Sequence, residues 1–229
     1  MAIRRRLGAT LLVACMTLSS VAAQAIPIGN AQGAAEFPDG AISFADAVAD
    51  YSPAIQGGQP TAGNRGSFNA LGAPNAQLDD VCDVAVECDS VSLGDGGSIT
   101  LRFLDNVLTG SDSPDLDLWI FEVGPDVEDT FVEVSVDGES WSFVGKVFGS
   151  TAGIDLDAFG FGTTSLFSWV RLTDDGDEGN QRGPAVGADI DAVGAIRTLP
   201  VTPPVPEPGT ALLLALGTAM LAARRIRAA

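Results

Sequence analysis

The sequence predicts an all-β fold, a β-sandwich, for the central part of the chain. Short stretches with apolar residues at every second position recur between residues 98 and 196. An Asp-Gly pair separates two of these stretches, which is the strongest short-range signal of a β-hairpin. No central stretch shows the long apolar periodicity of a helix. Many short strands without a long helix favour two packed sheets.

The first clear strands follow a turn at Asp95-Gly96-Gly97. Residues 98–104 place their apolar side chains on one face, as in a strand with one buried side. Residues 115–123 carry apolar side chains on both faces. This second pattern predicts a central strand that is covered on both sides.

A hairpin and two further strands complete the predicted sheets. Residues 131–136 and 139–144 alternate on either side of Asp137-Gly138, which predicts the hairpin. Residues 168–173 and 190–196 have the same alternation and predict the last two strands.

The region before these strands is less regular. Residues 28–33 are expected to form a flexible lead-in, and residues 41–51 one short helix or an edge strand. Residues 52–75 are rich in Gly, Pro, Asn and Gln and predict a long loop, with one short strand near 67–71. Three tryptophans are expected to pack between the sheets, with a binding platform as the alternative: Trp119, Trp141 and Trp169.

The charge distribution excludes nucleic acid as a partner. Six of the twelve basic residues lie at the two ends, whereas all thirty Asp and Glu lie between Glu36 and Glu207. The central segment therefore holds six basic against thirty acidic residues, a formal charge of −24. Such a surface repels phosphate backbones, and it suits an exported protein or one that binds hard cations through oxygen.

No catalytic residues are predicted. The chain contains no histidine, which excludes Ser-His-Asp and Cys-His catalysis and histidine-ligated zinc. No Gly-rich phosphate loop or G-x-S-x-G motif is present. We therefore expect a protein that is not an enzyme, with a carboxylate-dependent glycosidase or lyase as a remote alternative.

Residues 1–25 have the pattern of a secretory signal peptide. Three arginines precede an apolar run, and the segment ends in a small-x-small site at Ala23-Gln24-Ala25. Cleavage there would make Ile26 the first mature residue. The alternative is a lipobox at residues 12–15, which would make Cys15 a lipidated first residue.

The other two cysteines, Cys82 and Cys88, lie six positions apart in an acidic stretch. In an oxidising compartment such a pair favours a local disulfide, and a metal–thiolate site would need more ligands than these two.

The carboxyl end has three unlike parts. Pro206, Glu207 and Pro208 exclude a helix, the next fifteen residues are uncharged and rich in Leu and Ala, and the chain closes on a basic cluster. The arginines of this cluster are expected to stop at the cytoplasmic face: Arg224, Arg225 and Arg227. The order of parts resembles the PEP-CTERM sorting signal of exopolysaccharide-producing Gram-negative bacteria. That resemblance implies cleavage by a membrane enzyme of the exosortase type, and the alternative is an unprocessed tail anchor.

The central domain resembles the discoidin-like, galactose-binding-like jelly rolls. The hairpin sequence Ser135-Val136-Asp137-Gly138-Glu139-Ser140-Trp141 is similar to their S-x-D-G-x-x-W hairpin. The segments 70–75, 169–172 and 187–193 follow in the order that is typical of secreted bacterial domains of this type. The resemblance implies an eight-stranded jelly roll, often with structural calcium and a sugar-binding loop face.

Structural calcium is expected in the loop from Asp105 to Asp115. Calcium needs six to eight oxygen ligands, and the loop offers several oxygen-bearing side chains. The candidate ligands are Asp105, Asn106, Asp112 and Asp115, joined by Asp189 and Asp191 if the first and last strands are neighbours. The alternative is that these residues only form turns. The acidic run 173–180 lacks EF-hand spacing and is expected to be a solvated loop.

These observations predict a chain with five parts: a signal peptide (1–25), a lead-in (26–40), a jelly-roll-like β-sandwich (41–198), a linker (199–205) and a sorting signal (206–229). The expected function is that of an exported cell-surface or matrix protein, made as an inner-membrane precursor and linked to exopolysaccharide or biofilm. The alternative is a calcium-dependent carbohydrate-binding module.

Overall fold

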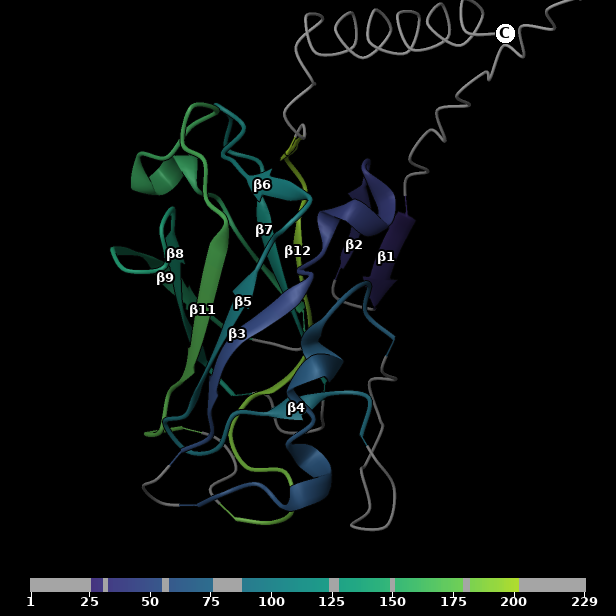
Figure 1. Ribbon diagram of the computed structural model, residues 1–229, viewed down its shortest axis with the longest axis vertical. Helices are drawn as coiled ribbons and strands as arrows, with labels where there is room; N and C mark the ends of the chain where they lie inside the picture. Colours follow the sequence, from purple (N-terminus) through teal and green to yellow (C-terminus); the bar gives the residue numbers. More distant parts are fainter. Residues whose placement is uncertain are drawn as a thin grey trace, which may run out of the picture.

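The computed structural model shows two β-sheets that face each other (Figure 1). It describes residues 26–30, 33–54, 58–75, 88–123, 128–148, 151–178 and 182–201. The predicted signal peptide and sorting signal lie outside these residues. Within the described residues, no helix is long and apolar enough to cross a membrane.

The larger sheet has five strands and the smaller has four, and all neighbouring pairs are antiparallel. In spatial order, the five are β3 (Ala47–Ser52), β5 (Ser98–Arg102), β11 (Trp169–Asp174), β8 (Thr130–Ser135) and β9 (Trp141–Val147). The four are β10 (Thr151–Ile154), β7 (Leu118–Glu122), β12 (Asp189–Ala195) and β4 (Val91–Ser92). The predicted all-β sandwich is therefore confirmed for the described residues.

Two small sheets and four short 3-10 helices complete the fold. The small sheets pair β1 (Ile26–Asn30) with β2 (Gly33–Phe37), and β6 (Asn106–Leu108) with β13 (Thr198–Pro200). The 3-10 helices are η1 (Gly40–Ser43), η2 (Ala62–Asn64), η3 (Ser67–Ala70) and η4 (Asp157–Phe159).

The main core lies between the two large sheets. Ile99 and Leu101 of β5 face Leu118 and Ile120 of β7, and none of the four is more than 1% exposed. Their spacing of two residues follows from the strand repeat, which turns alternate side chains to the same face. Burying each such side chain stabilises the fold by about 1.5–3 kcal/mol.

A second core covers the outer face of β7. Phe121 packs there against Phe37 and Phe44, whose rings lie 4.7 Å apart between centroids. Trp119 packs against the same cluster. The prediction of a central strand covered on both sides is confirmed.

The predicted β8–β9 hairpin is confirmed, with a loop held by one carboxylate. Asp137 Oδ1 accepts hydrogen bonds from the amides of Glu139 and Ser140, each 2.8 Å long. These bonds lower the pKa of Asp137 to about 2. Gly138 has φ +79° with the Trp169 ring beside it, and both its backbone angle and this close approach favour glycine.

Two expectations from the irregular region are corrected, and the two alternatives for residues 41–51 are both found. The lead-in is the β1–β2 hairpin, and Phe37 at its end is fully buried in the second core. Residues 41–51 contain both alternatives, because η1 is followed by the edge strand β3. Residues 67–70 form η3 instead of a strand, since the Asn69 side chain bonds the carbonyls of Cys88 and Ser90.

The prediction that the three tryptophans pack between the sheets is wrong. Trp119 packs in the second core on the outer face of β7, and Trp141 and Trp169 lie on the larger sheet outside the core. Trp169 alternates along β11 with the buried Val170, so it lies on the outer face of the larger sheet. There the Arg102 guanidinium lies 4.8 Å from the Trp169 ring centroid, and that of Arg171 lies 4.2 Å from the Trp141 ring centroid. These rings form cation–π contacts outside the core.

Candidate functional site

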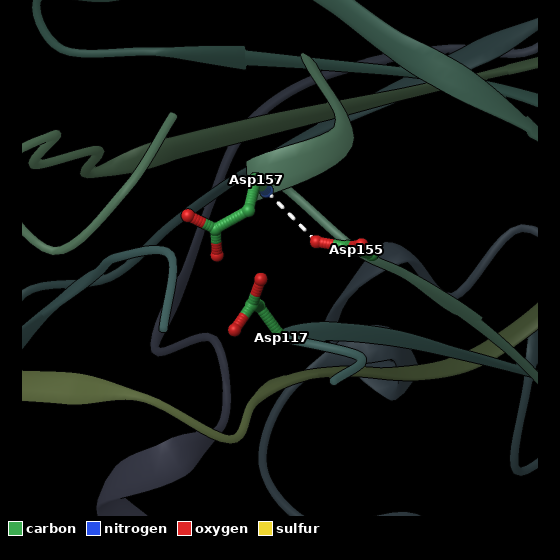
Figure 2. Close-up of side chains that lie close together, drawn as sticks. All are labelled: Asp117, Asp155 and Asp157. Carbon is green, nitrogen blue, oxygen red and sulfur yellow. Dashed lines mark hydrogen bonds between the residues drawn. The ribbon is translucent and has the colours of Figure 1, made fainter. Parts of the chain in front are cut away.

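Strand pairing brings three aspartates together at one end of the sandwich (Figure 2). β10 runs antiparallel to β7 with Ile154 opposite Leu118, so the residue after β10 lies near the residue before β7. These residues are Asp155 and Asp117, and Asp157 begins η4 two positions later. One carboxylate oxygen from each lies within 4.8 Å of the others. We call Asp117, Asp155 and Asp157 the aspartate cluster.

Backbone amides hold each carboxylate of the aspartate cluster in place through one oxygen. The Leu156 amide donates to Asp117 Oδ2 (3.0 Å), and the Asp157 amide donates to Asp155 Oδ1 (2.9 Å). Asp157 Oδ2 accepts from the amides of Ser111 and Asp112 at 2.8 and 3.0 Å. Within the described part of the chain, these contacts leave the second oxygen of each carboxylate free.

Asp117 is the buried member of the aspartate cluster. It is 0% exposed, and its Oδ1 atom has no hydrogen-bond partner among the described residues. Burial raises the pKa of Asp117, and the charges of Asp157 and Asp155 add to the rise; the Leu156 amide and the Ser111 side chain oppose it. The site therefore favours a positive charge or a proton next to this oxygen.

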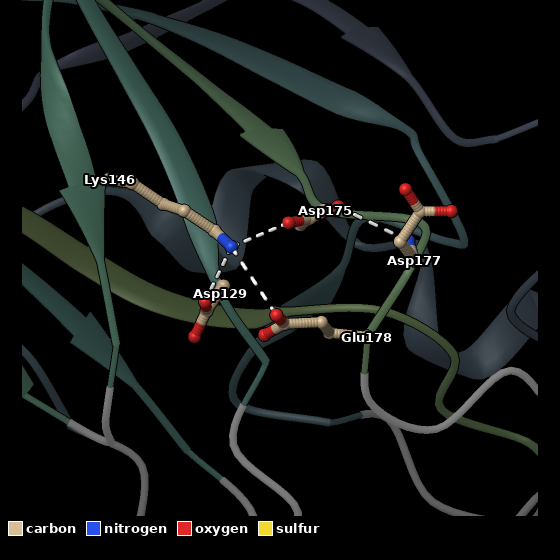
Figure 3. Close-up of polar contacts among 5 residues, drawn as sticks. All are labelled: Asp129, Lys146, Asp175, Asp177 and Glu178. Atoms are coloured by element: carbon tan, nitrogen blue, oxygen red, sulfur yellow. Dashed lines mark hydrogen bonds and ion pairs between the residues drawn. The ribbon is translucent and has the colours of Figure 1, made fainter.

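A second group of three carboxylates encloses a lysine (Figure 3). Lys146 Nζ lies 2.6 Å from both Asp129 Oδ2 and Asp175 Oδ2, and 3.6 Å from Glu178 Oε1. These contacts raise the pKa of Lys146 and lower that of Asp175. We call these four residues the lysine cluster. The predicted solvated loop 173–180 thus contributes two carboxylates to an ion-pair network.

The two clusters lie at different ends of the sheets. The β10–η4 turn with Asp155 and Asp157 lies at the upper end in Figure 1, and β11 runs from there to the lower end, where Asp175 follows it.

The predicted calcium ligands of the 105–115 loop are spread over separate contacts. Asp105 lies near Asp46, and burial together with that neighbouring charge raises its pKa. Asn106 is fully buried in β6, so part of the expected loop is a strand. Asp112 Oδ2 accepts from the Thr163 hydroxyl (2.6 Å), and Asp115 Oδ2 from the Ser113 hydroxyl (2.7 Å).

The other two predicted ligands lie on β12 and bond elsewhere. Asp189 accepts a hydrogen bond from the Ser92 hydroxyl, and burial raises its pKa to about 7. Asp191 accepts from the Asn75 amide at 3.2 Å. Of the six predicted ligands, none belongs to either group of three carboxylates found among the described residues. Calcium binding by the predicted set stays a prediction.

Sequence reasoning missed the aspartate cluster because it missed β10. Thr151–Ile154 lacks the alternation that identifies a strand, although Ile154 is buried. The available signal was the Asp-x-Asp spacing of Asp155 and Asp157.

Burial also raises the pKa of a glutamate at the opposite end of β7 from Asp117. Glu122 is 3% exposed at the end of β7, and burial raises its pKa to about 10, with a further rise from the Glu128 charge. The Glu128 amide donates to Glu122 Oε1 at 3.0 Å. Burial therefore favours the protonated form of the Glu122 carboxyl group.

A groove of about 540 Å³ lies between the β8–β9 loop and the loop that follows η4. Hydroxyl groups and one carboxylate line it together with two aromatic rings: Asp137, Ser140, Ser142, Phe161, Thr164, Ser165 and Phe167. The rings of Phe161 and Phe167 meet edge to face with centroids 5.1 Å apart. Apolar surface with a few hydroxyls is typical of small-molecule sites.

Only one cysteine of the predicted disulfide, Cys88, lies within the described residues. Cys88 is 3% exposed and its sulfur lies 2.8 Å from Asn64 Oδ1. Because Cys82 lies outside the described residues, the pairing stays a prediction. The same holds for the Ala23–Ala25 cleavage site and for lipidation of Cys15.

Comparison with known families identifies the carboxyl end. Residues 204–228 match the PEP-CTERM protein-sorting motif. The chain carries this sorting motif. The match includes Pro206, Glu207 and Pro208 and the three terminal arginines, so the predicted PEP-CTERM signal is confirmed. The motif implies an exported protein processed by an exosortase-type enzyme.

The other comparisons are weaker. No curated protein matches the chain significantly. Among solved structures, the C-terminal domain of a chitobiase from Bacteroides fragilis has 13% identity and a TM-score of 0.36, covering 70% of this chain and 96% of that one. CpGH89CBM32-6, produced by Clostridium perfringens, has 12% identity and a TM-score of 0.31, covering 46% and 72%. Both TM-scores are below 0.5, so no function is transferred from either structure.

Proposed function

We propose that the chain is an exported, non-enzymatic protein of the cell surface or extracellular matrix, and that it acts with exopolysaccharide or biofilm. The PEP-CTERM motif at residues 204–228 carries this proposal. In the proposed route, the precursor is held in the inner membrane by residues 210–223. An exosortase-type enzyme then cuts near Pro206–Pro208 and releases or attaches the β-sandwich.

Replacing Pro206, Glu207 and Pro208 together with alanine tests the sorting step. The variant should stay in the inner membrane at its unprocessed mass, whereas the unchanged chain should lose its arginine-rich end. Intact mass and terminal sequencing of both proteins provide the measurement, and they also show whether the mature chain begins at Ile26 or at a lipidated Cys15. Unchanged processing of the variant would contradict the proposal.

The groove favours a second candidate function, a calcium-dependent carbohydrate-binding module with a jelly-roll topology. Its volume of about 540 Å³ suits one or two sugar rings, and its hydroxyls and Asp137 can hydrogen-bond to sugar hydroxyls. The Leu166 side chain lines the groove and is 42% exposed, so it offers an apolar contact for the face of a ring.

Retention of the purified protein on the host polysaccharide tests this second function. Retention should be released by chelator and weakened about tenfold by Leu166→Ala. The matched control is Phe148→Ala, because Phe148 is 68% exposed and does not line the groove. Absence of retention on any glycan would exclude the module.

A further inference from the structure

The aspartate cluster places three carboxylate oxygens close enough to contact one ion. Its three ligand oxygens lie within 4.8 Å of one another. Oxygens this close can contact one ion, since two calcium–oxygen bonds of about 2.4 Å reach atoms up to about 4.8 Å apart. Three carboxylates on one ion are more typical of calcium than of magnesium, since magnesium keeps several of its waters.

An unsatisfied buried atom points to a ligand in the cluster. Asp117 is 0% exposed, and no group in the described part of the chain hydrogen-bonds to its Oδ1 atom. Figure 2 shows the Asp117 carboxylate directed toward that of Asp157. A buried polar atom without a partner costs about 1–3 kcal/mol, and more for a charged group, so native proteins rarely retain one.

Within the described ranges, no lysine or arginine forms an ion pair with the aspartate cluster. Among the described residues, the ion pairs join Lys146 to three carboxylates and Arg171 to Glu133, and none reaches the aspartate cluster. In the lysine cluster, one built-in cation contacts all three carboxylates. In the aspartate cluster, no cation of the described residues contacts the three carboxylates.

We propose that Asp117, Asp155 and Asp157 bind one calcium ion through their free carboxylate oxygens. The amides of Leu156, Ser111 and Asp157 already fix the carboxylates, so the ion meets a preformed site. Water or backbone carbonyls complete its coordination. The proposal depends neither on sorting nor on carbohydrate binding.

The proposed ion connects the aspartate cluster to the groove. The Phe161 amide donates to the Leu156 carbonyl (3.1 Å), and Leu156 lies between the two aspartates of the β10–η4 turn. Phe161 in turn lines the groove. Bound calcium therefore orders one wall of the groove, which is a physical reason for calcium-dependent ligand binding.

Calcium titration of the full chain, purified in mild detergent, tests the proposal. Calorimetry should show one site, and 1 mM calcium should raise the Tm by about 5 °C relative to EGTA, because an ion bound only to the native state stabilises it. Asp117→Asn should lose both signals. The control Asp175→Asn, in the lysine cluster, should keep both.

Asp155→Asn provides a second variant if Asp117→Asn fails to fold, since Asp155 is only half-buried. It should weaken calcium binding at least tenfold with an unchanged far-UV spectrum. An unchanged Tm of the parent protein in calcium, an equal response to magnesium, or full calcium binding by both variants would overturn the proposal.

Discussion

The lysine cluster and the aspartate cluster each bring three carboxylates together, but they differ in what balances the negative charge. In the lysine cluster, Lys146 Nζ lies within 4 Å of Asp129, Asp175 and Glu178. In the aspartate cluster, the same number of carboxylates is fixed by backbone amides and one oxygen is buried without a partner. The difference shows that carboxylate groups alone do not indicate a metal site in an acidic protein. The decisive feature is whether a protein cation already occupies their centre.

Glu122 differs from both clusters because burial favours its protonated form. Replacing it is expected to give the largest effect on stability among these predictions. Burial raises its pKa to about 10, so the folded protein holds a proton that the unfolded chain releases above pH 4.5. The free energy of unfolding should therefore fall as the pH rises from 4.5 to about 10, by up to about 1.4 kcal/mol per pH unit. Glu122→Gln should remove this fall, as measured by urea unfolding between pH 7 and 9.

Measuring between pH 7 and 9 separates the contribution of Glu122 to the pH dependence of stability from that of Asp189. The pKa of Asp189 is raised to about 7, so its own destabilising contribution grows between about pH 3.8 and 7 and is constant above. The exposed Glu139→Gln is the matched control and should keep the slope of the parent. A Glu122→Gln variant with the parent's slope would show that Glu122 is ionised in the folded state.

Removing the internal cation should turn the lysine cluster into a calcium-responsive one. Lys146→Met leaves Asp129, Asp175 and Glu178 without their counter-charge, so the Tm in EGTA should fall. Millimolar calcium should then restore part of the loss. Thermal unfolding of the variant in EGTA and in calcium provides the measurement.

Arg171→Met is the control for this exchange, because Arg171 pairs with the single carboxylate of Glu133. It should produce no new calcium response. If Lys146→Met also gains none, then grouping three carboxylates is insufficient, and the calcium assignment of the aspartate cluster loses its support from this comparison.

The smallest expected effect is on the stability of Asp117→Asn relative to the parent, which should be higher in EGTA and lower in calcium. In EGTA, Asp117→Asn removes a buried negative charge that has no cation, so the variant should be more stable than the parent by about 1 kcal/mol. In calcium the order should reverse, because only the parent gains the ion. Urea unfolding under both conditions measures the change, and a variant that is less stable under both would indicate a purely structural role for Asp117.

Local patterns predicted the sheets better than they predicted the clusters. The alternation in residues 98–104 and 168–173 identified β5 and β11, since strand periodicity is a property of consecutive residues. The aspartate cluster depends on the pairing of β10 with β7, about thirty residues apart, and no local pattern encodes that contact. The expected calcium ligands were chosen because four of them lie in one loop and because the last strand was expected to lie beside it. In the structure, Asn106 belongs to β6 and Asp189 accepts a hydrogen bond from Ser92.

The tryptophans teach a related lesson. Trp141 and Trp169 are large and lie on strands, which suggested core positions. Each lies on the face opposite the buried valines of its sheet, where an arginine covers it. The strand repeat assigned them to one face, but only the packing of the two sheets determined which face is buried.

Native mass spectrometry of the protein recovered from outside the cell tests the central claim most directly, namely that the aspartate cluster takes its cation from solution. The predicted result is one calcium ion per chain, present in the parent and in Asp175→Asn and absent from Asp117→Asn. A parent that carries no calcium, or an Asp117→Asn variant that carries as much as the parent, would contradict it.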